Sequence, residues 1–412
     1  SLLQKSTDYN QLLKAVEAKQ AVAVSGLSQA PRSHVLAAVH EQSGRPLIAV
    51  CQDDMAAKRL ASELGAFLGE EPPVLPSREL TLAGAIGVSR QWEQQRLRLL
   101  YALAQGRVPV LVASLDALLL RTIPRQTLFS ASVTLRVGAE YSMPDLISRL
   151  TRAGYSRASL VEGVGQFALR GGILDVYSPA QEKPLRAEFF GDELDTMGYF
   201  DPITQRRTEN VDEAVLLPVA ETEPHLHPQG ISGLCEDLRA IIARQQRRKT
   251  PNQALIETLQ KDCEALENET LFASADRYMA LIYPEFTTAA SYLPQEAVVA
   301  FCDHGNLQRG EKDRAEEFGL LLDSFLTAGT LFGELCDYYA TMDDLAASLH
   351  GRAVIYCDGF LAARYPESLP PKQLLSFTAR QLPGYGGSLE TAVADLKNYA
   401  SNQYGSIVLC GG

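Results

Sequence analysis

The chain has 412 residues, of which 46% are hydrophobic and 21% are charged, and its formal net charge is −12. This composition is typical of a soluble protein of several domains, and the acidic balance argues against tight nonspecific binding to DNA phosphates. We expect a cytoplasmic protein with no membrane span and no metal site, because no apolar run reaches 18 residues and the seven cysteines show no C-x-x-C spacing.

Residues 1–125 alternate between short apolar runs and helical patterns. Asp53 follows the second apolar run and is a predicted N-cap for the next helix. A later helical pattern places Trp92 in a stripe with leucines, which favours the core over a ligand site. Strands and helices in this order predict a parallel α/β sheet. The apolar runs lie at 21–24, 47–50 and 108–113.

The first strand leads into part of a phosphate-binding P-loop, whose pattern is G-x-x-x-x-G-K-[ST]. Gly26 and Ser33 stand at the first and last positions. Pro31 replaces the second glycine, and proline has no N–H to offer a phosphate and a fixed φ. Arg32 replaces the lysine, and no acidic pair follows a buried strand to hold Mg²⁺. We therefore expect a degenerate P-loop that does not bind ATP.

Residues 126–218 have the pattern of a small α+β domain inserted into the chain. A strand is predicted at 133–137 and a helix at 144–152, which Gly154 ends. Glycine, proline and aspartate then separate three runs of alternating apolar residues. An antiparallel sheet is the simplest interpretation. The three runs lie at 167–177, 185–190 and 194–200.

The strand 185–190 predicts what this sheet shows to the outside, because successive side chains alternate between its two faces. Two aliphatic residues and a phenylalanine share one face. The other face carries Arg186, Glu188 and Phe190. If helices cover only the first face, an arginine and an aromatic ring are exposed together, which is typical of a protein-binding surface.

Arg170 joins this face if the pair Gly171-Gly172 forms a bulge or a tight approach between strands. The alternative interpretation is that Phe190 belongs to the core. The arginines then pair with Glu188 and Asp192 at the surface, where ion pairs contribute little. The pattern alone leaves both interpretations open and by itself favours the second.

Residues 219–380 are rich in helix formers, with predicted helices at 231–248, 252–268 and 312–337. Strand candidates lie at 297–301 and 353–357. Residues 381–412 begin with a glycine-rich linker, followed by a predicted helix at 388–400 and a strand at 406–410. We interpret this end as the start of a further α/β domain and expect the natural protein to continue.

A basic cluster ends the first of these helices. It could contact DNA phosphates, but cations at a helix C-terminus are also favoured by the helix dipole. The helix dipole alone explains why the cluster is positively charged and why it lies at the end of the helix. The cluster consists of Arg244, Arg247, Arg248 and Lys249.

The inserted region also resembles a known family. Its motifs are similar to those of bacterial transcription-repair coupling factors, in the module that these share with the excision-repair subunit UvrB. The resemblance covers most of residues 1–220 and is thin afterwards. The segments that carry it are 165–167, 170–175, 186–190, 191–195 and 200–205.

The resemblance implies an adaptor rather than an enzyme. In the family the inserted domain docks on the repair subunit UvrA, and the positions of contact match Arg170, Arg186 and Phe190. The resemblance implies a RecA-like domain without a working nucleotide site, begun by residues 1–125 and completed by chain after the insertion. An RNA-polymerase-binding domain and a translocase that uses ATP and Mg²⁺ on double-stranded DNA are implied downstream.

The main alternative is an ATP-dependent helicase subunit of the excinuclease, such as UvrB itself, whose P-loop tolerates Pro31 and Arg32. UvrB carries a long aromatic hairpin that clamps damaged DNA, whereas residues 75–87 here are short and contain no aromatic side chain. Stacking on bases needs aromatic rings. We therefore expect that this chain does not verify lesions by inserting a hairpin between the strands.

Overall fold

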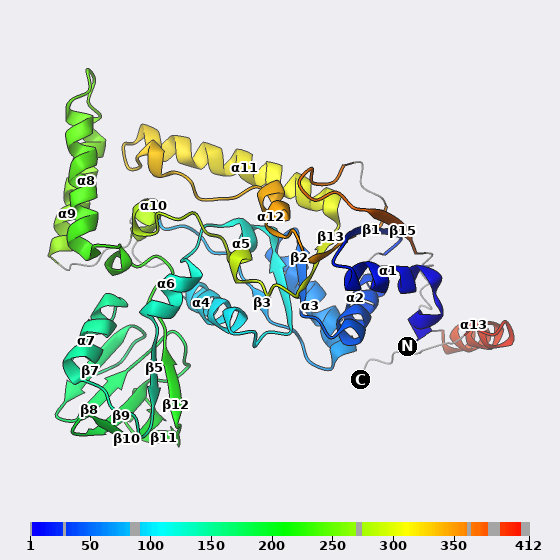
Figure 1. Ribbon diagram of the computed structural model, residues 1–412, viewed down its shortest axis with the longest axis horizontal. Helices are drawn as coiled ribbons and strands as arrows, with labels where there is room; N and C mark the ends of the chain where they lie inside the picture. Colours follow the sequence, from blue (N-terminus) through cyan, green and yellow to red (C-terminus); the bar gives the residue numbers. More distant parts are fainter. Residues whose placement is uncertain are drawn as a thin grey trace.

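The computed structural model describes residues 2–27, 30–82, 91–268, 274–360, 364–377 and 388–404. Figure 1 shows an elongated molecule with a parallel sheet in its middle, an antiparallel sheet at one end and a two-helix hairpin beside it. Within these residues no helix is both long enough and apolar enough to cross a membrane. The predicted strand 406–410 and residues 83–87 of the short segment lie outside the described residues.

The parallel sheet confirms the predicted α/β class. Its seven strands follow the order β15-β1-β14-β13-β2-β4-β3, and all neighbouring strands are parallel. Every residue of the five central strands is buried, which explains why they read as continuous apolar runs. The strands are β1 (Ala21–Ser25), β2 (Leu47–Cys51), β3 (Val74–Leu75), β4 (Val110–Ser114), β13 (Val298–Cys302), β14 (Ala353–Cys357) and β15 (Gln373–Ser376).

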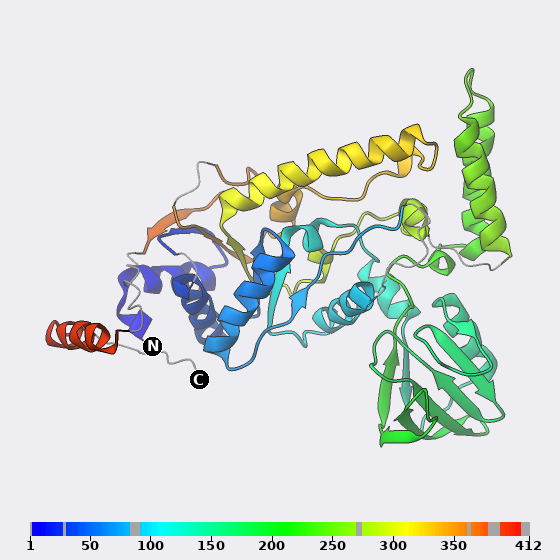
Figure 2. The ribbon, with the colours of Figure 1, turned by 180° about the vertical axis from the view of Figure 1, so that it is seen from behind.

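Helices cover both faces of this sheet. One face packs against α1 (Thr7–Glu17), α2 (Ala30–Ser43) and α3 (Asp54–Leu68), which Figure 2 shows in blue on the same side. The other face packs against α4 (Gln91–Ala104), α5 (Leu115–Leu119) and α12 (Met342–Ser348).

The sequence predicted the role of one residue in these helices correctly and that of another wrongly. Asp53 caps α3 as expected, because its carboxylate accepts a hydrogen bond of 2.7 Å from the N–H of Ala56. The prediction that Trp92 belongs to the core is wrong, since its side chain is 50% exposed. It lies at the start of α4, where Lys58 sits over the indole ring.

Residues after the insertion complete the parallel sheet, as the resemblance implied. β13 and β14 lie between β1 and β2, so four sequence-distant strands form the centre. β15 was not predicted, because this short strand at the sheet edge has only one buried residue, Leu375.

The antiparallel part lies between residues 133 and 216. Its six-stranded sheet has the order β11-β10-β9-β8-β7-β6, in which all neighbours are antiparallel except β6 and β7, which are parallel, and a separate pair joins β12 to β5. One face packs on α7 (Met143–Arg152) through a core of apolar side chains, and the predicted run 167–177 is a hairpin of two strands. The strands are β5 (Val133–Arg136), β6 (Ser156–Arg157), β7 (Gln166–Arg170), β8 (Ile173–Val176), β9 (Leu185–Phe190), β10 (Glu193–Phe200), β11 (Arg207–Asn210) and β12 (Glu213–Leu216).

Buried ion pairs hold the point where the chain returns from this sheet to the body. Arg96 and Glu221 are both fully buried and lie 3.0 Å apart. Arg78 binds Asp276 at 2.9 Å and lies 3.5 Å from Glu221. Removing one member would leave a buried charge unpaired, so this network fixes the base of the antiparallel part.

The remaining helices are a projecting two-helix hairpin, a long helix and several shorter elements. α8 (Gly230–Gln246) and α9 (Gln253–Glu267) form the projecting hairpin, close to the predicted bounds (Figure 1). α11 runs over His304–Thr327 rather than 312–337, and α13 (Leu389–Ser401) buries no residue. Short helices are α6 (Arg125–Ala131) and α10 (Met279–Ile282), with 3-10 turns at Leu2–Lys5, Pro224–Leu226, Ala275–Tyr278, Ala289–Tyr292 and Gly333–Leu335.

Candidate partner-binding site

Two tight turns end the antiparallel sheet at the same side. Gly171-Gly172 joins β7 to β8, and Gly191-Asp192 joins β9 to β10. Gly171 and Gly191 have φ angles of 61° and 64°, in the left-handed region that favours glycine. A Cβ at Gly172 would lie 2.7 Å from the carbonyl oxygen of Phe189, so the two glycines form a turn with a close approach rather than a bulge.

The strand β9 alternates as the sequence predicted. Leu185 and Ala187 are fully buried beneath the sheet, whereas Arg186 and its neighbour Glu188 are partly exposed. Phe190 ends the strand and is 83% exposed. The alternative that Phe190 belongs to the core is therefore wrong.

Arg170 and Arg186 lie together on one carboxylate, that of Asp175 in β8. Arg186 donates from Nε to Asp175 Oδ1 at 2.7 Å and from Nη2 to Oδ2 at 2.9 Å. Arg170 donates from Nη2 to Asp175 Oδ2 at 2.7 Å. The predicted pairing of the arginines with Glu188 and Asp192 is thus wrong, because strand register places Asp175 opposite Arg186.

Arg186 makes further contacts with the turn after β10. Its Nη1 and Nη2 donate to the carbonyl oxygen and Oε1 of Gln205 at 3.3 and 3.1 Å. Its guanidinium lies 4.5 Å from the ring centre of Phe200, which is fully buried. The hydrogen bond to Asp175 raises the pKa of Arg186, so this arginine is held charged and fixed in place.

We call Arg170, Asp175, Arg186 and Phe190 the outer-face site. Its exposed parts are the ring of Phe190, the half-exposed side chain of Arg170 and, beside them on β8, the partly exposed Ile173. Asp175 was not among the site residues predicted from the sequence. Its alternation with Leu174 and Val176 was the available signal, since it places the carboxylate on the outer face.

The degenerate P-loop is engaged in contacts within the fold. The N–H groups of Gly26 and Leu27 donate to the carbonyls of Gly359 and Asp358 at 3.1 and 3.3 Å. Gly26 has a φ of 81°, and a Cβ there would lie 1.9 Å from the carbonyl oxygen of Phe377. These N–H groups are consequently not aimed at an open phosphate site.

The polar side chains after the loop are paired as well. Arg32 is buried in the first turn of α2, which also contains Pro31, and donates from Nη1 to Asp303 Oδ2 at 2.6 Å. Ser33 donates to Glu63 Oε2 at 2.6 Å. The positive charge of Arg32 is therefore balanced by a carboxylate of the protein.

Among the described residues, one group of side chains has the spacing of metal ligands. The thiols of Cys235 and Cys263 and the carboxylate of Glu267 lie within 4.8 Å of one another on α8 and α9. Glu267 is also paired with Arg239 at 2.5 Å. The cysteines are buried in the apolar core of the helix hairpin, which accounts for them as packing residues.

The basic cluster lies at the tip of the helix hairpin. Arg244 pairs with Glu334 at 2.9 Å and lies over the ring of Phe332. Arg247, Arg248 and Lys249 are exposed beyond the last turn of α8. Their position at a helix C-terminus agrees with the dipole explanation.

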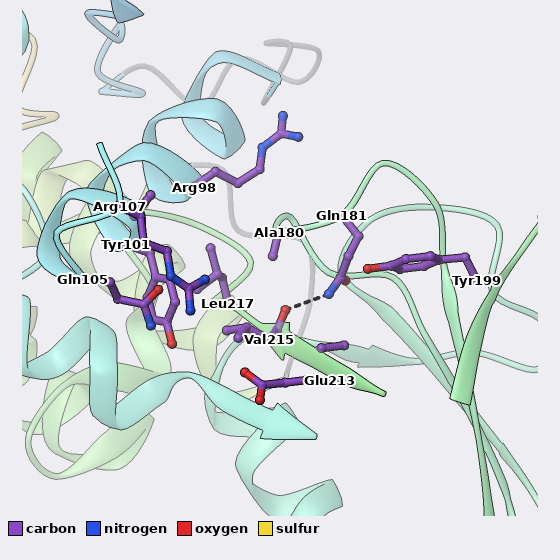
Figure 3. Close-up of a pocket in the computed structure, with 12 residues that line it drawn as sticks. Arg98, Tyr101, Gln105, Arg107, Ala180, Gln181, Tyr199, Glu213, Val215 and Leu217 are labelled. Carbon is purple, nitrogen blue, oxygen red and sulfur yellow. Dashed lines mark hydrogen bonds between the residues drawn. The ribbon is translucent and has the colours of Figure 1, made fainter. Parts of the chain in front are cut away.

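A cleft of about 340 Å³ lies where the antiparallel part meets α4 (Figure 3). Arg98, Tyr101 and Arg107 line it from the body, and Gln181 lines it from the insertion, where its Nε2 donates to the carbonyl of Val215 at 2.8 Å. No residue of the outer-face site lines this cleft.

Comparisons with known proteins agree with this geometry. Residues 133–221 match the model of the UvrB interaction domain. The chain is 37% identical over 221 residues to the transcription-repair-coupling factor of Myxococcus xanthus, covering 52% of the chain and 18% of the relative. It is 26% identical over 413 residues to that of Staphylococcus aureus (strain USA300), covering 98% of the chain and 34% of the relative.

A third relative is the transcription-repair-coupling factor of Bacillus subtilis (strain 168), which is 22% identical over 417 residues, covering 99% of the chain and 35% of the relative. The chain thus spans about a third of the length of the relatives that it matches from end to end. Residues 133–221 are thus similar to the UvrB interaction domain, and nearly the whole chain is similar to transcription-repair-coupling factors.

Proposed function

We propose that the chain is the amino-terminal adaptor module of transcription-coupled DNA repair, which recruits UvrA of nucleotide excision repair to stalled RNA polymerase. One observation carries this proposal. In the region that matches the UvrB interaction domain, the sheet face opposite α7 holds two arginines on one buried carboxylate, and it also carries an exposed phenylalanine. Such a face has the chemistry of a protein-binding surface.

The exposed ring of Phe190 supplies the apolar part of the binding energy. A phenyl ring in water gains free energy when a partner buries it, and aromatic and arginine side chains carry much of the energy at protein interfaces. The guanidinium groups supply specificity, since they donate charge-assisted hydrogen bonds to carboxylates. We therefore propose that Arg170, Arg186 and Phe190 belong to the UvrA-binding site.

The degenerate P-loop supports an adaptor without enzymatic activity of its own. The N–H groups of Gly26 and Leu27 are bonded to carbonyls, and Arg32 is neutralised by Asp303. We infer that this part of the protein uses no nucleotide, metal or other cofactor. We expect the full-length protein to contain an ATP- and Mg²⁺-dependent translocase that acts on double-stranded DNA. We also expect it to bind RNA polymerase as a second partner and to be located in the cytoplasm.

Binding to purified UvrA tests the assignment. Replacement of Arg170, Arg186 or Phe190 by alanine should each weaken binding by about 1 to 4 kcal/mol, measured by isothermal titration calorimetry. Phe360→Ala is the matched control, because Phe360 is 93% exposed but lies after β14 of the parallel sheet. If the triple variant binds UvrA like the wild type, the assignment is wrong.

Two titrations separate the adaptor from the other interpretations. Saturable, Mg²⁺-dependent binding of a fluorescent ATP analogue would favour a helicase subunit of the excinuclease. Binding of duplex DNA that falls steeply with salt, by about one power of the concentration per phosphate contacted, would favour a role for the cluster of Arg244, Arg247, Arg248 and Lys249. We expect neither for the isolated chain.

A further inference from the structure

We propose that Asp175 is the positioning residue of the outer-face site and that the two arginines have different tasks. Arg186 is committed to the sheet, whereas Arg170 presents its free N–H groups to an acidic side chain of the partner. This inference rests on the proposed function, since it names which group of the same surface meets the partner. It begins from the hydrogen bonds of three side chains.

Asp175 is a nearly buried carboxylate between two cations. Its side chain is 1% exposed, and its neighbours Leu174 and Val176 point into the core below the sheet. It accepts three hydrogen bonds, two from Arg186 and one from Arg170. A buried carboxylate needs such partners, and in return it fixes where both guanidinium groups lie.

Arg186 has little left to offer a partner. A guanidinium carries five N–H donors in a planar fork. Four hydrogen bonds from Arg186 are made within the protein, two to Asp175 and two to Gln205, and the plane of the group lies over Phe200. A bidentate contact with a partner carboxylate would require Arg186 to release either Gln205 or Asp175, and release of Asp175 would leave that carboxylate buried with fewer donors.

Arg170 is placed to make that contact. It makes one recorded hydrogen bond, from Nη2 to Asp175, and its side chain is 51% exposed. It precedes the turn Gly171-Gly172, which lies beside the end of β9, where Phe190 is exposed. The remaining N–H groups of Arg170 and the ring of Phe190 therefore face a partner from the same end of the sheet.

The carboxylate also sets the charge of the surface. One buried negative charge between two arginines leaves this cluster with a net positive charge, which is carried by the more exposed group, Arg170. The carboxylate of Glu188 on the same face is offset by Arg207, which lies 3.7 Å away. The partner surface that fits this arrangement has an acidic side chain next to an apolar pocket. Because Arg170 is half exposed, its contact with the partner should weaken as salt rises.

The test measures UvrA binding by the full chain at low and at high salt, with three variants. Asp175→Asn keeps the shape of the side chain but removes its charge and turns an amide N–H₂ group toward the arginines. We expect it to weaken binding about tenfold, and we expect Arg170→Gln to weaken binding and to reduce its salt dependence. The control is Asp145→Asn, an exposed carboxylate on α7 at the covered face, which should bind like the wild type.

A double-mutant cycle distinguishes positioning from a general loss of structure. If Asp175 acts through Arg170, the combination of Asp175→Asn with Arg170→Gln should bind about as well as the weaker of the two single variants. Independent, additive losses would overturn the positioning role. If Asp175→Asn unfolds the domain, the variants Arg170→Gln and Arg186→Gln provide the test instead. The proposal would be overturned if the salt dependence of UvrA binding is lost in Arg186→Gln but kept in Arg170→Gln.

A second readout does not depend on UvrA. In nitrogen-15 NMR spectra the Nε–H of Arg186 should exchange slowly with water in the wild type and rapidly in Asp175→Asn. If the wild type fails to bind UvrA, the proposed function is wrong, and this exchange rate alone decides whether Asp175 fixes Arg186. If the wild type binds and Phe190→Ala weakens it while Asp175→Asn does not, the positioning role is wrong and the proposed function stands.

Discussion

The two large sheets of this molecule differ in how many of their faces are covered. Helices cover both faces of the parallel sheet, and every residue of its five central strands is buried. The inserted six-stranded sheet, which is antiparallel except at β6 and β7, is covered by α7 on one face, and β9 alternates between buried and partly exposed residues. Only the second arrangement lets strand side chains reach a partner.

The polar groups of the two sheets follow the same division. At the P-loop of the parallel sheet, Arg32 is buried and its charge is balanced by Asp303. On the outer face of the antiparallel sheet, one carboxylate is shared by two arginines, and Arg170 keeps donors for another molecule. The described part of the P-loop therefore makes its contacts within the fold, whereas the inserted sheet exposes the ring of Phe190 and half of the Arg170 side chain.

The largest expected difference concerns a phenylalanine in each sheet. Phe301 in β13 is fully buried and stacks on Tyr356, with ring centres 5.4 Å apart. Phe301→Ala should lower the free energy of unfolding by about 3 to 5 kcal/mol, whereas Phe190→Ala should change it by less than about 0.5 kcal/mol. Urea unfolding followed by circular dichroism measures both. Equal losses would show that the outer face is not free.

A glycine substitution at the degenerate P-loop tests how tightly the parallel sheet holds this loop, for comparison with the outer face of the inserted sheet. Gly26→Ala should lower the free energy of unfolding by about 1 to 3 kcal/mol, because the new Cβ meets the carbonyl of Phe377. Gly44→Ala is the matched control, since Gly44 also has a positive φ, of 64°, but no atom lies within 4 Å of its added Cβ. The difference between the two variants, measured by urea unfolding, isolates the close approach. No difference would mean that the loop opens at little cost.

The smallest expected effect is a dependence on pH at the carboxyl edge of the parallel sheet. Burial raises the pKa of Asp358 to about 6, with Asp303 acting in the same direction and Arg32 against it. Burial also lowers the pKa of His304 to about 4. The ordinary values are 3.8 and 6.5, so both groups titrate differently in the folded and unfolded chains between pH 4 and 6.

The two effects have opposite signs. The folded chain keeps a proton on Asp358 that the unfolded chain releases, so this group's contribution to stability falls as pH rises. The unfolded chain protonates His304 and the folded chain does not, so that contribution rises with pH. Each slope is at most about 1.4 kcal/mol per pH unit, and together they nearly cancel.

Urea unfolding at several pH values between about 4.5 and 5.5 separates these contributions. The stability of Asp358→Asn should rise with pH relative to the wild type, because only the His304 contribution remains. The stability of His304→Gln should fall with pH. Parallel profiles for all three proteins would contradict the assignment of these protonation states.

The elements of the parallel sheet could be predicted better than their arrangement. Its central strands are buried on both faces, so their apolar runs are visible in the sequence. The order of the strands depends on contacts across about three hundred residues, and local patterns carry no signal for it. β15 was missed because its residues, apart from Leu375, are exposed. Trp92 was misplaced because an amphipathic stripe shows which residues share one face of a helix. It does not show how much of that face the neighbouring elements cover.

The candidate site shows the same limit at shorter range. The alternation of side chains along β9 predicted which face of the sheet carries Arg186 and Phe190, since this alternation is a local property of a strand. The partner of the arginines depends on the register between β8 and β9, and this register places Asp175 opposite Arg186. Alternation with Leu174 and Val176 could place Asp175 on the outer face, but only the folded sheet shows that it lies opposite Arg186.

The position of β13 and β14 between β1 and β2 has a consequence for how the protein is made. The neighbours of β1 are β14 and β15, so β1 stays without a strand partner until residues 353 to 376 have left the ribosome. The six-stranded antiparallel sheet, in contrast, is contained within residues 156–210. Because chains fold as they emerge, we expect the inserted sheet to form while the sheet that carries it is still incomplete.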